Sequence, residues 1–180
     1  MEAFLIKEEL LLAKRVNNYQ RLLRKILKFM NNNLKIVIPN PPITEKDIVE
    51  AEKKIGIAFP NDYKNFLLKN NGGKIYYNSF DRILGDNHKI NYSIEAFESL
   101  ESLLEAWSFL KDDEFFKPAK LLPIAQTLGP TLIGISFVPD HYGRIFVFDW
   151  DFGSTFQANN IIEFLEQIKY TPEGSNYPLF

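Results

Sequence analysis

The chain has 180 residues, of which 46% are hydrophobic and 24% are charged, as in an ordinary soluble globular protein. It contains no cysteine, which excludes disulfides, thiolate metal sites and cysteine nucleophiles, and no apolar run approaches the roughly 20 residues of a membrane-spanning helix. The first residues lack the apolar core and cleavage site of a signal peptide, so we expect a cytoplasmic protein.

The net charge of −2 hides an uneven distribution along the chain. Residues 1–38 carry eight Lys or Arg and three Glu, a net charge of +5, which leaves 13 of the 21 basic and 20 of the 23 acidic residues, a net charge of −7, in residues 39–180. Such a split is typical of polyanion binding or of attraction between two parts of a chain. The basic part has no arginine–aromatic interleaving and no helix-turn-helix, so we predict no direct nucleic-acid binding.

Residues 3–31 are predicted to form a basic amphipathic helix, because apolar residues recur there at spacings of three and four. The apolar seam of this helix must pack against the rest of the chain, a second copy or a partner. An extended, proline-rich connector follows, and its prolines at 39–43 indicate a boundary. We therefore expect a helical extension over 1–38 and one domain over 39–180.

Two helices with recognisable ends are predicted next. Thr44 and Asp47 have the spacing of a capping box, and Gly56 is a typical stop. Pro60 then begins a second helix. Glu52 lies near the apolar stripe of the first helix, either half-exposed at its edge or partly buried and hydrogen-bonded to the start of the second.

Gly72, Gly73 and Lys74 superficially suggest a phosphate-binding loop. Such a loop places its glycines between a strand and the positive end of a helix, whereas these glycines follow a helix, whose carbonyl end is negative. Lys74 is also followed by Ile75 instead of Ser or Thr. We therefore interpret the two glycines as a helix terminus and a turn.

The rest of the chain is predicted to be mostly β-structure. A polar loop is expected over 80–91, a capped helix after Ser99 and a last helix over 160–169. Strands are expected at 74–77, 92–97, 121–127, 131–138 and 144–151. This order predicts an α+β domain in which helices pack a mainly antiparallel sheet.

Catalytic and metal sites are poorly supported. The stretch GISFV ends in Val138 where a nucleophile elbow needs glycine, and both histidines, His88 and His141, lie in polar loops. Asp149 and Asp151 have strand spacing, so with the turn at 140–141 they could hold an oxygen-preferring metal, or simply form an acidic rim. We predict no enzyme, no cofactor and no metal.

The strand over 144–151 has two apolar faces. Ile145 and Val147 point one way, and Phe146, Phe148 and Trp150 point the other. If helices cover only one side of the sheet, an aromatic surface remains for recognition. The alternative is a strand that is buried on both faces.

Residues 43–73, ITEKDIVEAEKKIGIAFPNDYKNFLLKNNGG, resemble the signature of the SUKH superfamily. LLPIAQTLGPTLIGISF and GRIFVFDWD resemble later parts of the same pattern, which covers about 43–169 in order. The positions with a structural role in this signature are Glu52, Gly56, Pro60, Tyr63, Phe66, Asn71, Gly72, Gly73 and Pro123.

The resemblance implies a SUKH-like α+β domain and, in bacteria, an immunity protein that binds and neutralises a toxin domain, often a nuclease or deaminase, without catalysis. The fungal relatives act as scaffolds, so an interaction scaffold that dimerises through the N-terminal helix is the alternative. Asp112, Asp113 and Glu114 add acidic surface. The residues expected to contact the toxin are Asp140, Tyr142, Phe146, Phe148, Asp149, Trp150 and Asp151.

Overall fold

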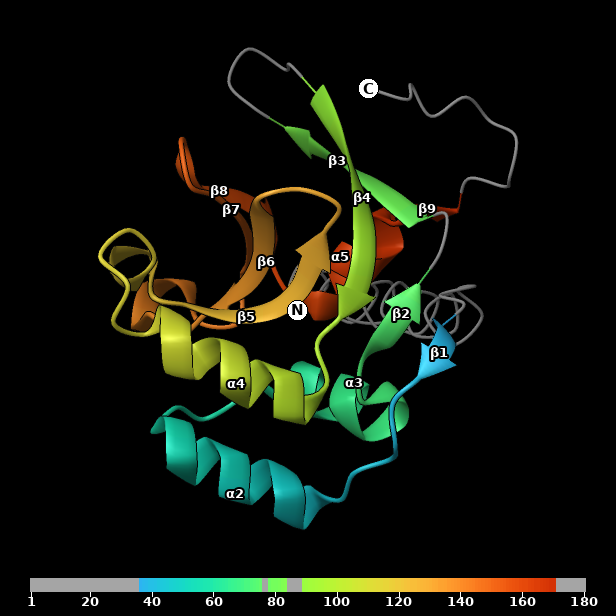
Figure 1. Cartoon of the computed structure of the whole chain (residues 1–180), viewed down its shortest axis with the longest axis vertical. Coiled ribbons are helices and arrows are strands. Elements are labelled where there is room, and N and C mark those ends of the chain that lie inside the picture. Colours follow the sequence, from blue (N-terminus) through green and yellow to red (C-terminus); the bar gives the residue numbers. More distant parts are fainter. Residues whose placement is uncertain (1–35, 76–77, 84–88, 171–180) are drawn as a thin grey trace, which may run out of the picture. The chain divides into compact units, whose positions relative to one another are not determined.

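A computed structural model describes residues 36–75, 78–83 and 89–170. In these ranges four α-helices and one antiparallel sheet of nine strands confirm the α+β domain that the sequence predicts (Figure 1). None of the helices in the described ranges has the length and apolarity needed to cross a membrane. The basic helix predicted for 3–31 lies outside the described residues.

Each helix begins at a residue whose position the sequence marks. Thr44 and Asp47 form the predicted capping box, and Gly56 ends that helix in a left-handed conformation with φ of 76°. Ser99 caps a later helix by accepting a hydrogen bond from the amide of Ser102. The helices are α2 (Glu45–Ile55), α3 (Asn61–Asn70), α4 (Leu100–Leu110) and α5 (Ile161–Gln167).

The sheet has the strand order β1-β2-β4-β5-β6-β7-β8, with β3 paired to both β4 and β9. Every pair is antiparallel, and β5 to β8 form a simple meander. The strands are β1 (Ile36–Pro39), β2 (Gly73–Ile75), β3 (Asn78–Ile83), β4 (Lys89–Phe97), β5 (Leu121–Thr127), β6 (Thr131–Ser136), β7 (Ile145–Asp149), β8 (Gly153–Ala158) and β9 (Lys169–Tyr170).

The polar loop predicted for 80–91 is largely wrong, because β3 and the start of β4 occupy its described residues. Phe80 and Arg82 are both buried on one face of β3, so a charged side chain occupies a position where a strand pattern would show an apolar residue. The connector before the domain also contributes to the sheet, since Ile38 of β1 pairs with Lys74 of β2. Three residues that the sequence assigns to the extension, 36–38, thus belong to a strand.

An aromatic core joins the helices to the sheet. The ring of Phe97 lies 5.1 Å from that of Phe66 on α3 and 6.5 Å from that of Phe164 on α5. Phe164 is also 5.3 Å from Phe80 on β3. A second, smaller cluster forms around Phe116, Leu121 and Phe148.

The double glycine is the helix terminus and turn that the sequence predicts. Asn71 and Gly72 follow α3 with φ of 42° and 67°, and β2 begins at Gly73. A Cβ atom on Gly72 would lie 2.3 Å from the carbonyl oxygen of Glu98, so only glycine fits between α3 and the end of β4.

Candidate protein-binding surface

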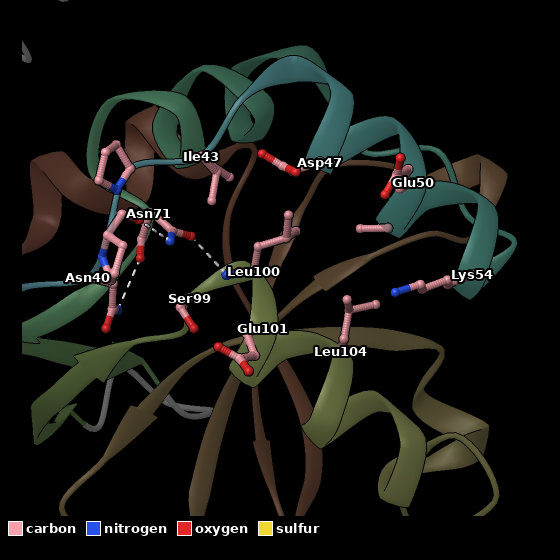
Figure 2. Close-up of a pocket in the computed structure, with 13 residues that line it drawn as sticks. Asn40, Ile43, Asp47, Glu50, Lys54, Asn71, Ser99, Leu100, Glu101 and Leu104 are labelled. Atoms are coloured by element: carbon pink, nitrogen blue, oxygen red, sulfur yellow. Dashed lines mark hydrogen bonds between the residues drawn. The ribbon is translucent and has the colours of Figure 1, made fainter.

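The signature asparagine organises the pocket shown in Figure 2, which has a volume of about 340 Å³ and lies between residues 40–43, α2 and α4. The side chain of Asn71 donates to the carbonyl oxygen of Pro41 at 2.6 Å and accepts from the amide of Leu100 at 2.9 Å. The side chain of Asn40 donates to the Asn71 carbonyl at 3.1 Å. Asn71 therefore ties together three segments that are distant in sequence.

The charged residues of this pocket are exposed on its rim: Asp47, Glu50 and Lys54 from α2, and Glu101 from α4 (Figure 2). Asp47 accepts hydrogen bonds from the backbone amide and the hydroxyl of Thr44. These hydrogen bonds lower the pKa of Asp47, and the one from the amide has the larger effect. Leu100 and Leu104 point toward α2 from below. The pocket is a groove with a charged rim and a partly apolar lining, in which the side chains of Asp47 and Asn71 already form hydrogen bonds within the fold.

Glu52 is partly buried and hydrogen-bonded, the second of its two sequence-based interpretations. Its Oε1 accepts from the amide of Phe59 at 2.6 Å and from the ammonium of Lys64 at 2.7 Å. Burial by itself would raise the pKa of Glu52, but the bonds from Lys64 and Phe59 outweigh it and lower the pKa. Glu52 thus fastens the end of α2 to the start of α3.

The buried side chain of Asp149 holds the turn between β7 and β8 through hydrogen bonds. It is 8% exposed, and its Oδ1 accepts from the amides of Asp151 at 2.9 Å and Phe152 at 3.3 Å. Its Oδ2 lies 3.4 Å from the guanidinium of Arg82. The predicted shared face of Asp149 and Asp151 is wrong, because the strand ends at Asp149 and the chain turns; Asp151 is exposed.

The predicted contact residues do not form one cluster. Asp140 and Tyr142 lie in the connection before β7, whereas Trp150 and Asp151 follow it, with a five-residue strand of about 3.3 Å per residue between the two groups. The hydroxyl of Tyr142 donates to the carbonyl oxygen of Ala58 at 2.9 Å, and burial raises its pKa. A metal site uniting the two groups is not formed, and no cluster of three potential ligands occurs among the described residues.

The face of β7 that carries Phe146 and Phe148 is partly covered. It is therefore neither the fully exposed aromatic surface nor the fully buried face that the sequence left open. Phe148 is buried, with its ring 5.0 Å from that of Phe116 and 5.0 Å from that of Trp150. Phe146 is half-buried beside the exposed Phe156 of β8, at 5.9 Å between the rings. Phe148 and Asp149 therefore cannot contact a partner directly and instead support the residues that can.

Two segments that contain none of the predicted contact residues join this end of the sheet. The turn at 128–130 lies beside the turn at 150–152, because Thr131 pairs with Asp149. The loop at 112–116 lies there too, since the ring of Phe116 is 6.5 Å from that of Trp150. We call the exposed residues of these segments the tip surface: Asp112, Glu114, Phe115, Leu128, Trp150, Asp151 and Phe152.

Comparison with known proteins places this architecture in a family. A model of the SMI1 / KNR4 family (SUKH-1) matches residues 42–167, which are 126 of the 180 residues. The chain belongs to the SUKH-1 family. The matched residues include the signature around Asn71, the β5–β8 meander and the whole tip surface, so the resemblance seen in the sequence is confirmed.

A curated bacterial protein shares a shorter segment with this chain. The uncharacterized protein YnaB of Bacillus subtilis (strain 168) is 46% identical over 35 residues, which are 19% of this chain and 24% of YnaB. The match thus spans about a quarter of the length of that relative. What the SUKH-1 domain binds in this protein has to be inferred from its own surface.

Proposed function

We propose that this SUKH-1 protein is an immunity protein that binds a toxin domain and neutralises it without catalysis. The observation that carries the proposal is the exposure of large apolar side chains at the tip surface: Phe152 is 80% exposed, Leu128 72% and Phe115 62%. Exposed apolar side chains that gather at one place, with a polar rim, are typical of protein-binding sites. This surface lies at one end of the sheet and is formed by the loop at 112–116 and the turns at 128–130 and 150–152.

The charge around these side chains favours a basic partner. Asp112, Glu114 and Asp151 are exposed beside them, and residues 39–180 carry a net charge of −7. A nuclease holds phosphates in a positively charged cleft, which an acidic surface complements. A cytoplasmic toxin nuclease is therefore the partner that we propose.

The turn at 150–152 is held before the partner arrives. Asp149 binds two amides of the turn, and Phe116 and Phe148 support the ring of Trp150 from beneath. A surface that is already ordered loses less conformational entropy on binding. This support favours tight inhibition through Trp150, since aromatic side chains of this kind dominate binding energies.

A binding role without catalysis is supported by the contacts that buried and partly buried charged side chains make among the described residues. Arg82 pairs with Asp149, Glu52 with Lys64, and Glu98 accepts a hydrogen bond from Gln126. Each of these contacts joins two elements of the fold. We therefore assign no catalytic residue and no cofactor to this protein.

Co-expression with the toxin encoded beside this gene tests the proposal. We expect the two proteins to purify together and the cells to survive. Trp150→Ala combined with Phe152→Ser should weaken the complex about 30-fold or more, as expected for interface anchors. Val49→Ser is the matched control, because Val49 is an exposed apolar residue on α2, outside the tip surface. An absence of both complex and protection, or equal effects of the two variants, would refute the proposal.

A further inference from the structure

A separate pocket of about 200 Å³ lies between the end of α4, the 3-10 helix η2 (Lys117–Ala119) and the start of β5. Its apolar lining is largely aromatic: Trp107, Phe116, Leu121 and Phe137. The rings of Trp107 and Phe137 meet edge to face at 5.6 Å between centroids. Phe116 separates this pocket from the tip surface, since it also contacts Trp150.

The mouth of the pocket carries three lysines. Lys111 follows Trp107 by one helical turn, Lys117 begins η2, and Lys120 follows η2 with a left-handed backbone. Of the described residues that line the pocket, none is acidic. Asp112 lies 3.8 Å from Lys117, but both side chains are more than half exposed, with 74% and 65%, so this ion pair is weak.

This concentration of positive charge contrasts with the net charge of −7 on residues 39–180. The floor of the pocket attracts an apolar group, and its rim attracts carboxylates. Pockets for drug-sized molecules have volumes of roughly 300–1,000 Å³, so about 200 Å³ suits one large side chain better. Aromatic side chains are the usual anchors in pockets of this kind at protein interfaces.

We infer that this pocket binds one aromatic side chain of a partner protein, presented by a segment in which acidic residues flank the aromatic residue. The ring packs against Trp107 and Phe137, which line the pocket, and the flanking carboxylates pair with Lys111, Lys117 and Lys120. The inference does not depend on toxin neutralisation, because it uses residues outside the tip surface and a partner segment of opposite charge.

Fluorescence of Trp107 can report on this pocket directly. The chain has two tryptophans, so Trp150→Phe leaves Trp107 as the sole reporter. The probe is the peptide acetyl-Glu-Asp-Phe-Asp-Glu-amide, for which we expect a saturable change in emission. A peptide with Ala in place of Phe, and one with Gln and Asn in place of the acids, should each bind about tenfold more weakly or worse.

Two doubly substituted proteins decide where the peptide binds. In the Trp150→Phe background, Lys117→Glu with Lys120→Glu should weaken binding about tenfold, since exposed ion pairs contribute up to about 1 kcal/mol each. Lys53→Glu with Lys74→Glu changes the net charge equally at exposed lysines elsewhere and should leave binding unchanged. If the first variant does not fold, as judged by its thermal melt, Lys117→Gln with Lys120→Gln replaces it.

Equal affinities of the two charge-reversal variants would overturn the assignment, because the peptide would then respond only to net charge. No saturable change in the fluorescence of Trp107 would also overturn it. Neither result would bear on the tip surface, which the co-expression experiment tests separately.

Discussion

Gly56 and Gly72 both have a left-handed backbone, but their surroundings differ. A Cβ atom added to Gly56, which has φ of 76°, would have no other atom within 4 Å, whereas one added to Gly72, with φ of 67°, would lie 2.3 Å from the carbonyl oxygen of Glu98. The strain of an L-residue in this conformation is common to both sites. Of these two glycines, only Gly72 would also overlap with backbone atoms.

We therefore predict that Gly56→Ala lowers the free energy of unfolding by about 1 kcal/mol, the cost of the left-handed conformation alone. Gly72→Ala should lower it by about 3 kcal/mol or more, because α3 and β4 must also move apart. Urea denaturation of both variants measures the difference. Equal losses would show that the close approach of Gly72 to Glu98 is not important for stability.

Glu98 makes stability depend on pH. It is 5% exposed, and burial raises its pKa above the ordinary value of 4.5, although the hydrogen bond from Gln126 acts in the opposite direction. The folded protein therefore holds this proton more tightly than the unfolded chain does. Ionisation of Glu98 destabilises the fold as the pH rises from 4.5 through the raised pKa, and the full penalty applies above it.

Glu98→Gln should remove this penalty, since the amide oxygen can still accept from Gln126. We expect the stability of the variant, relative to the wild type, to increase from pH 4.5 toward neutral pH. Urea denaturation at a series of pH values gives the difference. Parallel pH profiles for the two proteins would contradict the assignment.

At the scale of secondary-structure elements, the pair of Arg82 and Asp149 joins β3 to β7. Arg82 is 1% exposed, and its guanidinium also donates to the Thr155 hydroxyl of β8 at 2.6 Å. A buried ion pair of this kind contributes little compared with an apolar replacement, but removal of one partner leaves an unpaired buried charge. The two residues should therefore be strongly coupled.

We predict that Arg82→Met lowers the free energy of unfolding by about 3–5 kcal/mol. Adding Asp149→Asn should restore part of this loss, because the asparagine is neutral and its oxygen can still accept from the amides of Asp151 and Phe152. A double-mutant cycle by urea denaturation measures the coupling. Additive effects would show that the two side chains do not interact across the sheet.

The elements themselves were predictable where their signals are local. The capping box of α2, the proline before α3 and the apolar run of β5 lie within a few residues of the structure that they specify. β3 was missed because Arg82 interrupts its apolar pattern. The charge of Arg82 is balanced by Asp149, and its guanidinium also donates to Thr155; both residues are more than 60 positions away. A partner so distant leaves no trace in the local pattern.

At the scale of the whole molecule, the excess of acidic residues should control how fast a basic partner associates. Long-range attraction between exposed charges is screened by salt, with a Debye length of about 10 Å at 0.1 M ionic strength. The association rate with the proposed toxin should therefore fall steeply between about 0.05 and 0.5 M salt.

Two charge variants test this dependence in stopped-flow or surface-binding measurements. Asp151→Lys with Glu114→Lys should reduce the association rate and flatten its dependence on salt. Glu45→Lys with Glu50→Lys makes the same change in net charge on exposed residues of α2 and should have a smaller effect. If the two doubly substituted variants associate at equal rates, the association rate depends on net charge alone and not on the charges of the tip surface.

The binding surface depends on contacts that the sequence does not display. Trp150 and Asp151 were predicted as contact residues and are exposed, but Phe148 and Asp149 were predicted with them and are turned inward. The alternation of a strand shows which residues share a face, whereas burial depends on what packs against that face. Here it is Phe116, whose position follows from the path of a loop about 30 residues earlier in the chain.

Caps, stops and turns act over a few residues, so the α+β class, the family, the ends of α2 and α3 and the role of the double glycine could be predicted from the sequence. The fold was needed to show that Leu128, Phe115 and Phe152 lie at one end of the sheet, and that three lysines line an aromatic pocket. Those arrangements depend on strand register and on the packing of loops, which bring together residues that are far apart along the chain.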